Sequence, residues 1–157
     1  MYLHKVKKQL IELKLASPDE LLGCTQDEVI KLEAKLGILL PKAYQEFLLL
    51  MGNSAGKFLR GSDCFFRDLP FLKDWAIALL EENSFPASLP EDAFVFFMHQ
   101  GYQFSFFRVS QGDDPPTYSY CEGTNETAFV KSHDRYSDFL MTEVEIHGKY
   151  LFSGIGG

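Results

Sequence analysis

The sequence lacks any long run of apolar residues, so we expect no membrane-spanning helix. A span needs roughly 20 consecutive apolar residues, whereas runs such as residues 47–51 are short. Residues 1–8 carry charges where the apolar stretch of a secretory signal would lie, so no signal peptide is expected. Neither a membrane location nor export is therefore indicated.

Cysteine and histidine are sparse and lack the spacing of a metal site. Cys24, Cys64 and Cys121 are widely spaced and odd in number, which indicates a reducing, cytoplasmic compartment. None of the four histidines lies three or four residues from another histidine or a cysteine, and neither Cys-x-x-Cys nor His-Glu-x-x-His occurs. We therefore expect no metal and no other cofactor.

Basic residues are outnumbered, since 15 lysines and arginines face 22 aspartates and glutamates, a net charge of −7. Because phosphate contacts supply much of the affinity for nucleic acids, this balance disfavours nucleic-acid binding. Residues 1–60 hold nine basic and seven acidic residues, whereas residues 61–157 hold six and fifteen. Within residues 81–126, Arg108 is the only basic residue against eight acidic ones. Such a segment fits either a surface for a basic protein partner or a solvated face without a partner.

Apolar residues make up 46% of the chain and aromatic residues 15%, which excludes intrinsic disorder. With 157 residues and neither repeat nor linker, we expect one domain over residues 1–152 and a flexible tail at residues 153–157. The pattern predicts an α+β fold, with N-terminal helices packed on a mixed or antiparallel sheet, a β-meander and a C-terminal helix.

The first half of the chain is predicted to be mainly helical. Apolar residues recur at every third or fourth position in residues 2–15, 41–51 and 70–83. Residues 17–20 and 25–28 each carry a capping signature that predicts a helix start, and Gly37 is placed to end the second of these helices. Trp75 lies in an apolar helical stripe, so we interpret it as a core residue.

The second half is predicted to hold most of the strands. Residues 93–99 form a nearly continuous apolar run, typical of a strand covered on both faces. Alternating patterns predict two further strands of a meander, at residues 103–109 and 117–122. Residues 57–66 predict one or two short strands, and a final helix is expected from about Tyr136.

No motif indicates catalysis. Cys64 and Cys121 neighbour aromatic residues on predicted strands, and we interpret both as small buried core residues. The alternative is an enzyme that pairs either thiol with His99 or His133, because a nucleophile needs an adjacent base. We favour a protein that is not an enzyme and has no catalytic residue.

One segment stands out by the order of its residues. It runs Glu33-x-x-Leu36-Gly37-x-x-Leu40-Pro41-x-x-Tyr44-x-x-Phe47-Leu48 and is followed by Met51-Gly52-Asn53. This order resembles the signature segment of the SUKH superfamily, and the later strands and closing helix are similar to the family's as well. The resemblance covers about residues 20–145 and implies an α+β fold. We interpret five residues of the signature as core: Leu36, Leu40, Tyr44, Phe47 and Leu48.

The superfamily includes fungal Smi/Knr-type regulators of cell-wall glucan synthesis and bacterial immunity proteins that bind and neutralise a protein toxin, often a nuclease. The resemblance therefore implies a cytoplasmic protein-binding domain. It would be an immunity protein against a basic toxin or, alternatively, a regulatory or scaffold protein. We expect a monomer or a weak homodimer. The partner contact should combine acidic with exposed aromatic side chains. The candidate residues are Glu81, Glu82, Tyr102, Asp113, Asp114, Tyr118 and Glu122.

Overall fold

The structure, a computed structural model, describes the backbone of residues 1–155 and the side chains of residues 1–149. Its helices are α1 (His4–Glu12), α2 (Gln26–Leu36), α3 (Lys42–Met51), α4 (Leu69–Glu82) and α5 (Tyr136–Ile155), with 3-10 turns at Pro18–Glu20, Phe66–Asp68 and Val109–Gln111. Its strands are β1 (Leu21–Leu22), β2 (Ser54–Ala55), β3 (Ser62–Asp63), β4 (Ala93–His99), β5 (Gln103–Arg108), β6 (Thr117–Cys121) and β7 (Val130–His133).

The predicted flexible tail of residues 153–157 overlaps the end of α5. The backbone is helical up to Ile155, and residues 156–157 lie outside the described residues. The domain limits of residues 1–152 stay a prediction.

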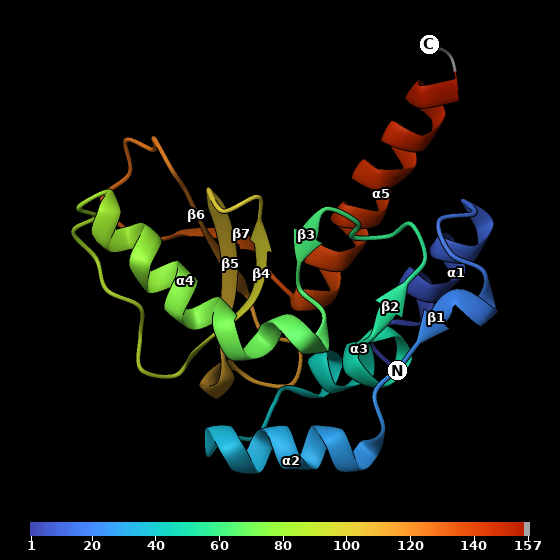
Figure 1. Cartoon of the computed structure of the whole chain (residues 1–157), viewed down its shortest axis with the longest axis horizontal. Helices are drawn as coiled ribbons and strands as arrows, with labels where there is room; N and C mark the ends of the chain where they lie inside the picture. The colour runs from blue at the N-terminus through green and yellow to red at the C-terminus, as the bar shows by residue number, and fades with distance from the viewer. Residues whose placement is uncertain (156–157) are drawn as a thin grey trace.

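Five strands form the main sheet in the order β3-β4-β5-β6-β7, while β1 and β2 pair separately. Every neighbouring pair is antiparallel, and β4 to β7 form a meander. The sheet lies between α4 on one side and α1, α3 and α5 on the other (Figure 1). The predicted α+β class, with its N-terminal helices, meander and C-terminal helix, is confirmed, and the sheet is antiparallel rather than mixed.

β4 is covered on both faces, as its apolar run predicts. Phe94, Phe96 and Phe97 belong to the core shared with α1, α3 and α5, whereas Val95 and Met98 belong to the core beneath α4. The pairing register with β5 shifts between Val95 and Phe97. A bulge of this kind lets the consecutive Phe96 and Phe97 contribute to the same core.

Local sequence signals account for most helix ends. The Thr25 hydroxyl accepts the Glu28 N–H at 3.1 Å, the Glu28 carboxylate accepts the Thr25 N–H at 2.9 Å, and Gly37 ends α2 with φ of 66°. The same signature at residues 17–20 does not start an α-helix but closes a single 3-10 turn. The reason is that the backbone becomes extended at Leu21, where β1 pairs with β2.

Three residues that we expected in the core lie at the surface. Leu36, the last residue of α2, is 44% exposed, and Cys121, the last residue of β6, is exposed as well. Trp75 is 43% exposed because α4 directs Leu72 and Ala76 towards the sheet and leaves the indole on the flank of this stripe. The other five residues expected in the core are buried: Leu40, Tyr44, Phe47, Leu48 and Cys64.

In the main sheet, one strand lies outside the segments predicted as strands, and one short strand lies within its predicted segment. β7 was not predicted, because Val130–His133 is a short, polar segment whose strand character comes from pairing with β6. In residues 57–66 the structure has one short strand, β3, which pairs with the end of β4. The helices predicted over residues 2–15, 41–51 and 70–83 are α1, α3 and α4.

Candidate protein-binding surfaces

The seven predicted contact residues do not form one surface. Tyr102, in the turn between β4 and β5, lies beside Glu122, whose backbone N–H donates to the Tyr102 carbonyl oxygen at 2.8 Å. Asp113 and Asp114 lie in the connection between β5 and β6, at the opposite end of these antiparallel strands. The structure therefore brings Tyr102 and Glu122 together and separates them from the aspartate pair.

Glu81 and Glu82 are both exposed in the last turn of α4, yet they line different hollows. Successive helix residues point in directions about 100° apart. Glu81 lines a hollow of about 410 Å³ together with the segment that follows α4. Glu82 lines a hollow of about 370 Å³, which we name the α4 hollow. Its lining residues are Asp63, Trp75, Ala78, Leu79, Glu82, Met98 and Gly101.

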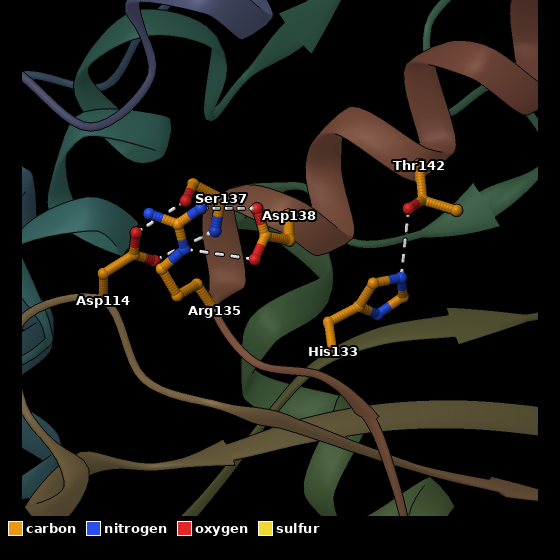
Figure 2. A network of polar contacts seen from close by, with 6 residues as sticks. All are labelled: Asp114, His133, Arg135, Ser137, Asp138 and Thr142. Carbon is orange, nitrogen blue, oxygen red and sulfur yellow. Dashed lines mark hydrogen bonds and ion pairs between the residues drawn. The ribbon is translucent and has the colours of Figure 1, made fainter.

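Asp114 is held by the first turn of α5 (Figure 2). The Ser137 backbone N–H donates to Asp114 Oδ1 at 2.9 Å, and the Ser137 hydroxyl donates to Oδ2 at 2.6 Å. Next to it, Arg135 donates to both carboxylate oxygens of Asp138 at 3.1 Å. The Asp113 side chain is exposed, so it is the more accessible of the two aspartates.

Of the two predicted aromatic contacts, Tyr102 is the more accessible. It is 37% exposed and packs edge-on against His99 with ring centroids 5.7 Å apart. Tyr118 is half-buried, stacks on Phe106 at 5.3 Å and donates its hydroxyl to the Gln111 side chain at 3.1 Å. A partner can reach Tyr102 with less rearrangement, and the role of both residues in binding stays a prediction.

An aromatic pair on α4 was not predicted from the sequence. Phe71 and Trp75 are 52% and 43% exposed, and their rings stack with centroids 5.6 Å apart and planes inclined by 19°. The i, i+4 spacing places both on one side of the helix. The signal was present in the sequence, since both residues lie to one side of the stripe formed by Leu72, Ala76 and Leu79.

The α4 hollow is negatively charged. Asp63 and Glu82 are the charged residues that line it among the described part of the chain. Burial, reinforced by the negative charge of Asp68, raises the pKa of the Asp63 carboxyl above its usual value. Arg67 opposes this shift only in part, and its guanidinium lies 4.0 Å from Asp68 and over the Phe65 ring. A positive group placed in the hollow would favour the ionised form of Asp63.

A second accessible surface is mainly apolar and carries basic side chains. A groove of about 580 Å³ lies between α1 and α3, with apolar side chains such as Leu49 and Ile11 and the basic residues Lys7 and Lys8. Leu49 is 39% exposed. The groove therefore differs from the acidic α4 hollow, since its two lysines lie beside a single acidic residue, Glu46.

Within the described residues, no hydrogen bond joins a cysteine thiol to a histidine; the Cys24 thiol faces Asn53 and His99 Nδ1 lies 3.0 Å from the Ser62 hydroxyl. Burial raises the pKa of the Cys24 thiol to about 11 and that of Cys64 well above its usual value. His133 lies in β7, and its Nε2 is 3.1 Å from the Thr142 hydroxyl (Figure 2). Over the residues that the structure describes, no group of three or more His, Cys, Asp or Glu residues is placed to hold a metal.

The signature segment serves the fold. The Glu33 carboxylate accepts the Leu40 backbone N–H at 2.7 Å and the Gln45 side-chain N–H at 3.3 Å, which fixes the corner between α2 and α3. Tyr44 is buried at the centre of an aromatic cluster that includes Phe107 and Tyr136. The segment that carries the resemblance therefore shapes the corner between α2 and α3 and the aromatic core.

The chain is an α+β domain in which helices cover both faces of an antiparallel meander. A model of the SMI1 / KNR4 family (SUKH-1) matches residues 23–142, and the chain belongs to this family. The resemblance predicted over residues 20–145 is thereby confirmed. A comparison with curated proteins found no match. Within the described residues, no helix combines the length and apolar character needed to cross a membrane.

Proposed function

We propose that this protein is a non-enzymatic immunity protein that binds and neutralises a basic protein toxin of the nuclease type in the cytoplasm. The observation that carries the proposal is the pairing of negative charge with accessible aromatic rings around α4 and the neighbouring hairpin. Asp63 and Glu82 line the α4 hollow. The exposed Trp75 also lines it, and the exposed Tyr102 directly follows the lining residue Gly101 in the sequence.

Charge complementarity supports a basic partner. A nuclease binds nucleic acid through basic residues, so its functional surface is positively charged. An acidic partner is steered towards such a surface and can cover it without any chemistry of its own. Glu81, Glu82, Glu122 and Asp113 are exposed and available for this role. Asp114 would need to give up its contacts with Ser137.

The buried thiols support a function without catalysis. A thiol is nucleophilic as the thiolate, and the raised pKa values of Cys24 and Cys64 keep both protonated near neutral pH. Cys121 is exposed at the end of β6. We expect alkylation of Cys121 to leave toxin neutralisation unchanged, which a comparison of treated and untreated protein would measure.

A rescue assay tests the proposal. The C-terminal segment of the protein encoded immediately upstream is expressed in a test cell, with and without the full chain. Immunity predicts that this segment kills alone and that cells survive when both are present. A segment that is harmless, or that kills in the presence of this chain, contradicts the proposal at that locus.

A regulatory or scaffold protein of the cell-wall-synthesis type is the second candidate. The α1–α3 groove favours it, because a second surface that carries Lys7 and Lys8 suits a different partner from the one attracted by the α4 hollow. This function predicts several partners bound with micromolar affinity, whereas immunity predicts one tight complex. Binding of the upstream segment by titration calorimetry distinguishes the two functions.

A further inference from the structure

The stacked pair of Phe71 and Trp75 is the largest aromatic feature on the outer side of α4. Both rings are accessible, and they stack on each other across one turn of the helix. Aromatic side chains carry a large share of the binding energy in protein contacts. The chain contains one tryptophan, so this side chain is also a unique spectroscopic reporter of its surroundings.

We propose that the α4 hollow receives an arginine side chain of the partner protein, with the guanidinium against the Trp75 ring and paired with Asp63 and Glu82. The partner in this contact is the basic toxin of the proposed function, on which the inference therefore rests.

The arrangement of the lining residues suits this occupant. Trp75, Ala78 and Glu82 follow one another along one side of α4, while Asp63 approaches from β3 and Met98 from β4. The apolar floor of Leu79 and Met98 can accommodate the methylene groups of a long side chain, and the carboxylates can pair with its charged end. The volume of about 370 Å³ lies near the lower limit of about 300–1,000 Å³ for ligand pockets, so a side chain fits better than a large ligand.

Arginine fits this site better than lysine. A guanidinium is planar, stacks on aromatic faces and offers several N–H donors, so one group can contact an indole and two carboxylates together. The two carboxylates come from different elements, and no basic residue lines the hollow in the described part of the chain. The basic group is therefore expected to come from the partner.

Peptide titrations of the full chain test this inference directly. One probe is a glycine-flanked peptide with a single arginine, and the matched probe carries citrulline, which has nearly the same shape but no charge. Trp75 fluorescence reports binding. We expect a saturable change with the arginine peptide that weakens as salt is added, and no saturable change with the citrulline peptide.

Two sets of variants locate the site. Asp63→Asn combined with Glu82→Gln should weaken binding of the arginine peptide by about threefold to tenfold, the scale of two partly exposed ion pairs. Asp74→Asn combined with Glu91→Gln is the matched control, because it removes the same two charges from exposed residues that do not line the α4 hollow. Equal responses to the two peptides, or equal affinities for the double variant and wild type, would overturn the inference.

The peptide assay is independent of the rescue assay. A successful rescue with no preference for the arginine peptide would reject the arginine contact and leave the immunity function standing. Arginine binding at the α4 hollow without rescue would reject the toxin pairing and retain the site. Failure of the arginine contact and failure of the toxin pairing therefore give different results in the two assays.

Discussion

Asp114 accepts two hydrogen bonds from Ser137, one from the backbone N–H at 2.9 Å and one from the hydroxyl at 2.6 Å. This pair joins the loop between β5 and β6 to the first turn of α5, where backbone N–H groups have no partner within the helix. The carboxylate also lies at the positive end of the helix dipole. Asp114 thus supports the fold, whereas the side chain of the adjacent Asp113 is exposed.

Asp114→Ala should therefore destabilise the protein, whereas Asp113→Ala should not. Loss of hydrogen bonds to a charged group at a helix start should lower the free energy of unfolding by about 1–3 kcal/mol. Urea denaturation followed by circular dichroism measures the change. Asp114→Asn keeps one acceptor oxygen and should fall between wild type and Asp114→Ala. Equal losses for Asp113→Ala and Asp114→Ala would contradict this assignment.

Phe71→Ala and Trp75→Ala should affect binding more than stability. Both side chains are about half exposed, so each change should lower the free energy of unfolding by no more than about 1 kcal/mol. At a partner interface, truncation of an aromatic anchor typically costs about 2 kcal/mol or more, which is over tenfold in Kd. Calorimetric titration with the toxin segment identified by rescue measures this effect.

Leu79→Ala is the contrasting variant on the same helix. Leu79 is 5% exposed and belongs to the core beneath α4, so its truncation should cost about 2–5 kcal/mol in stability. If Trp75→Ala lowered the melting temperature as much as Leu79→Ala, its effect on binding would reflect loss of structure. The assignment of Trp75 to a contact surface would then be wrong.

The fold could be predicted where the signal is local. The capping pair of Thr25 and Glu28, the stop at Gly37 and the apolar run of β4 each depend on residues close together in the sequence. β7 depends on pairing with β6, and its polar residues carry no local strand signal. The exposure of Trp75 was missed because apolar spacing identifies a helical stripe but not its edges.

The α4 hollow could not be predicted from the sequence. Asp63 and Glu82 lie on different elements, and the pairing of Asp63 with Met98 between β3 and β4 brings the aspartate beneath α4. The acidic segment of residues 81–126 was identified correctly as a charge pattern. It excluded Asp63, however, and it included Asp114, whose carboxylate is engaged with Ser137.

Acidification from pH 7.5 to pH 5.5 should destabilise the protein through His133 and His147. Burial lowers the pKa of both imidazoles in the folded state. The unfolded chain, with histidine pKa values near 6.5, therefore takes up protons first as the pH falls. Above about pH 6.5, the pKa of histidine in the unfolded chain, the free energy of unfolding is at its full value. Below it, stability falls by at most about 1.4 kcal/mol per pH unit for each histidine.

Urea denaturation at a series of pH values measures this dependence. His133→Gln and His147→Gln should each flatten the decline, and the double variant should flatten it most. His4→Gln is the control, because His4 is exposed on α1. An unchanged decline in the double variant would show that other groups cause the loss of stability.

Gly23→Ala should strongly destabilise the protein, because the backbone of α3 passes directly over this residue. A Cβ added to Gly23 would lie 1.7 Å from the Leu49 carbonyl oxygen, and the next residue, Cys24, donates its N–H to Leu48 at 2.8 Å. Neither backbone can move without breaking this contact, so we expect a loss of about 3 kcal/mol or more in the free energy of unfolding. Urea denaturation of the variant and wild type measures the loss.

Gly148→Ala is the control for Gly23→Ala. Its added Cβ would meet the movable end of the Leu13 side chain at 3.1 Å, within α5 where alanine is the better helix former by about 1 kcal/mol. Its stability should therefore stay within about 1 kcal/mol of wild type. If Gly23→Ala also matched wild type, the close approach of residue 23 to α3 would be absent in solution. The corner that the β1–β2 pair and α3 form would then need a different packing.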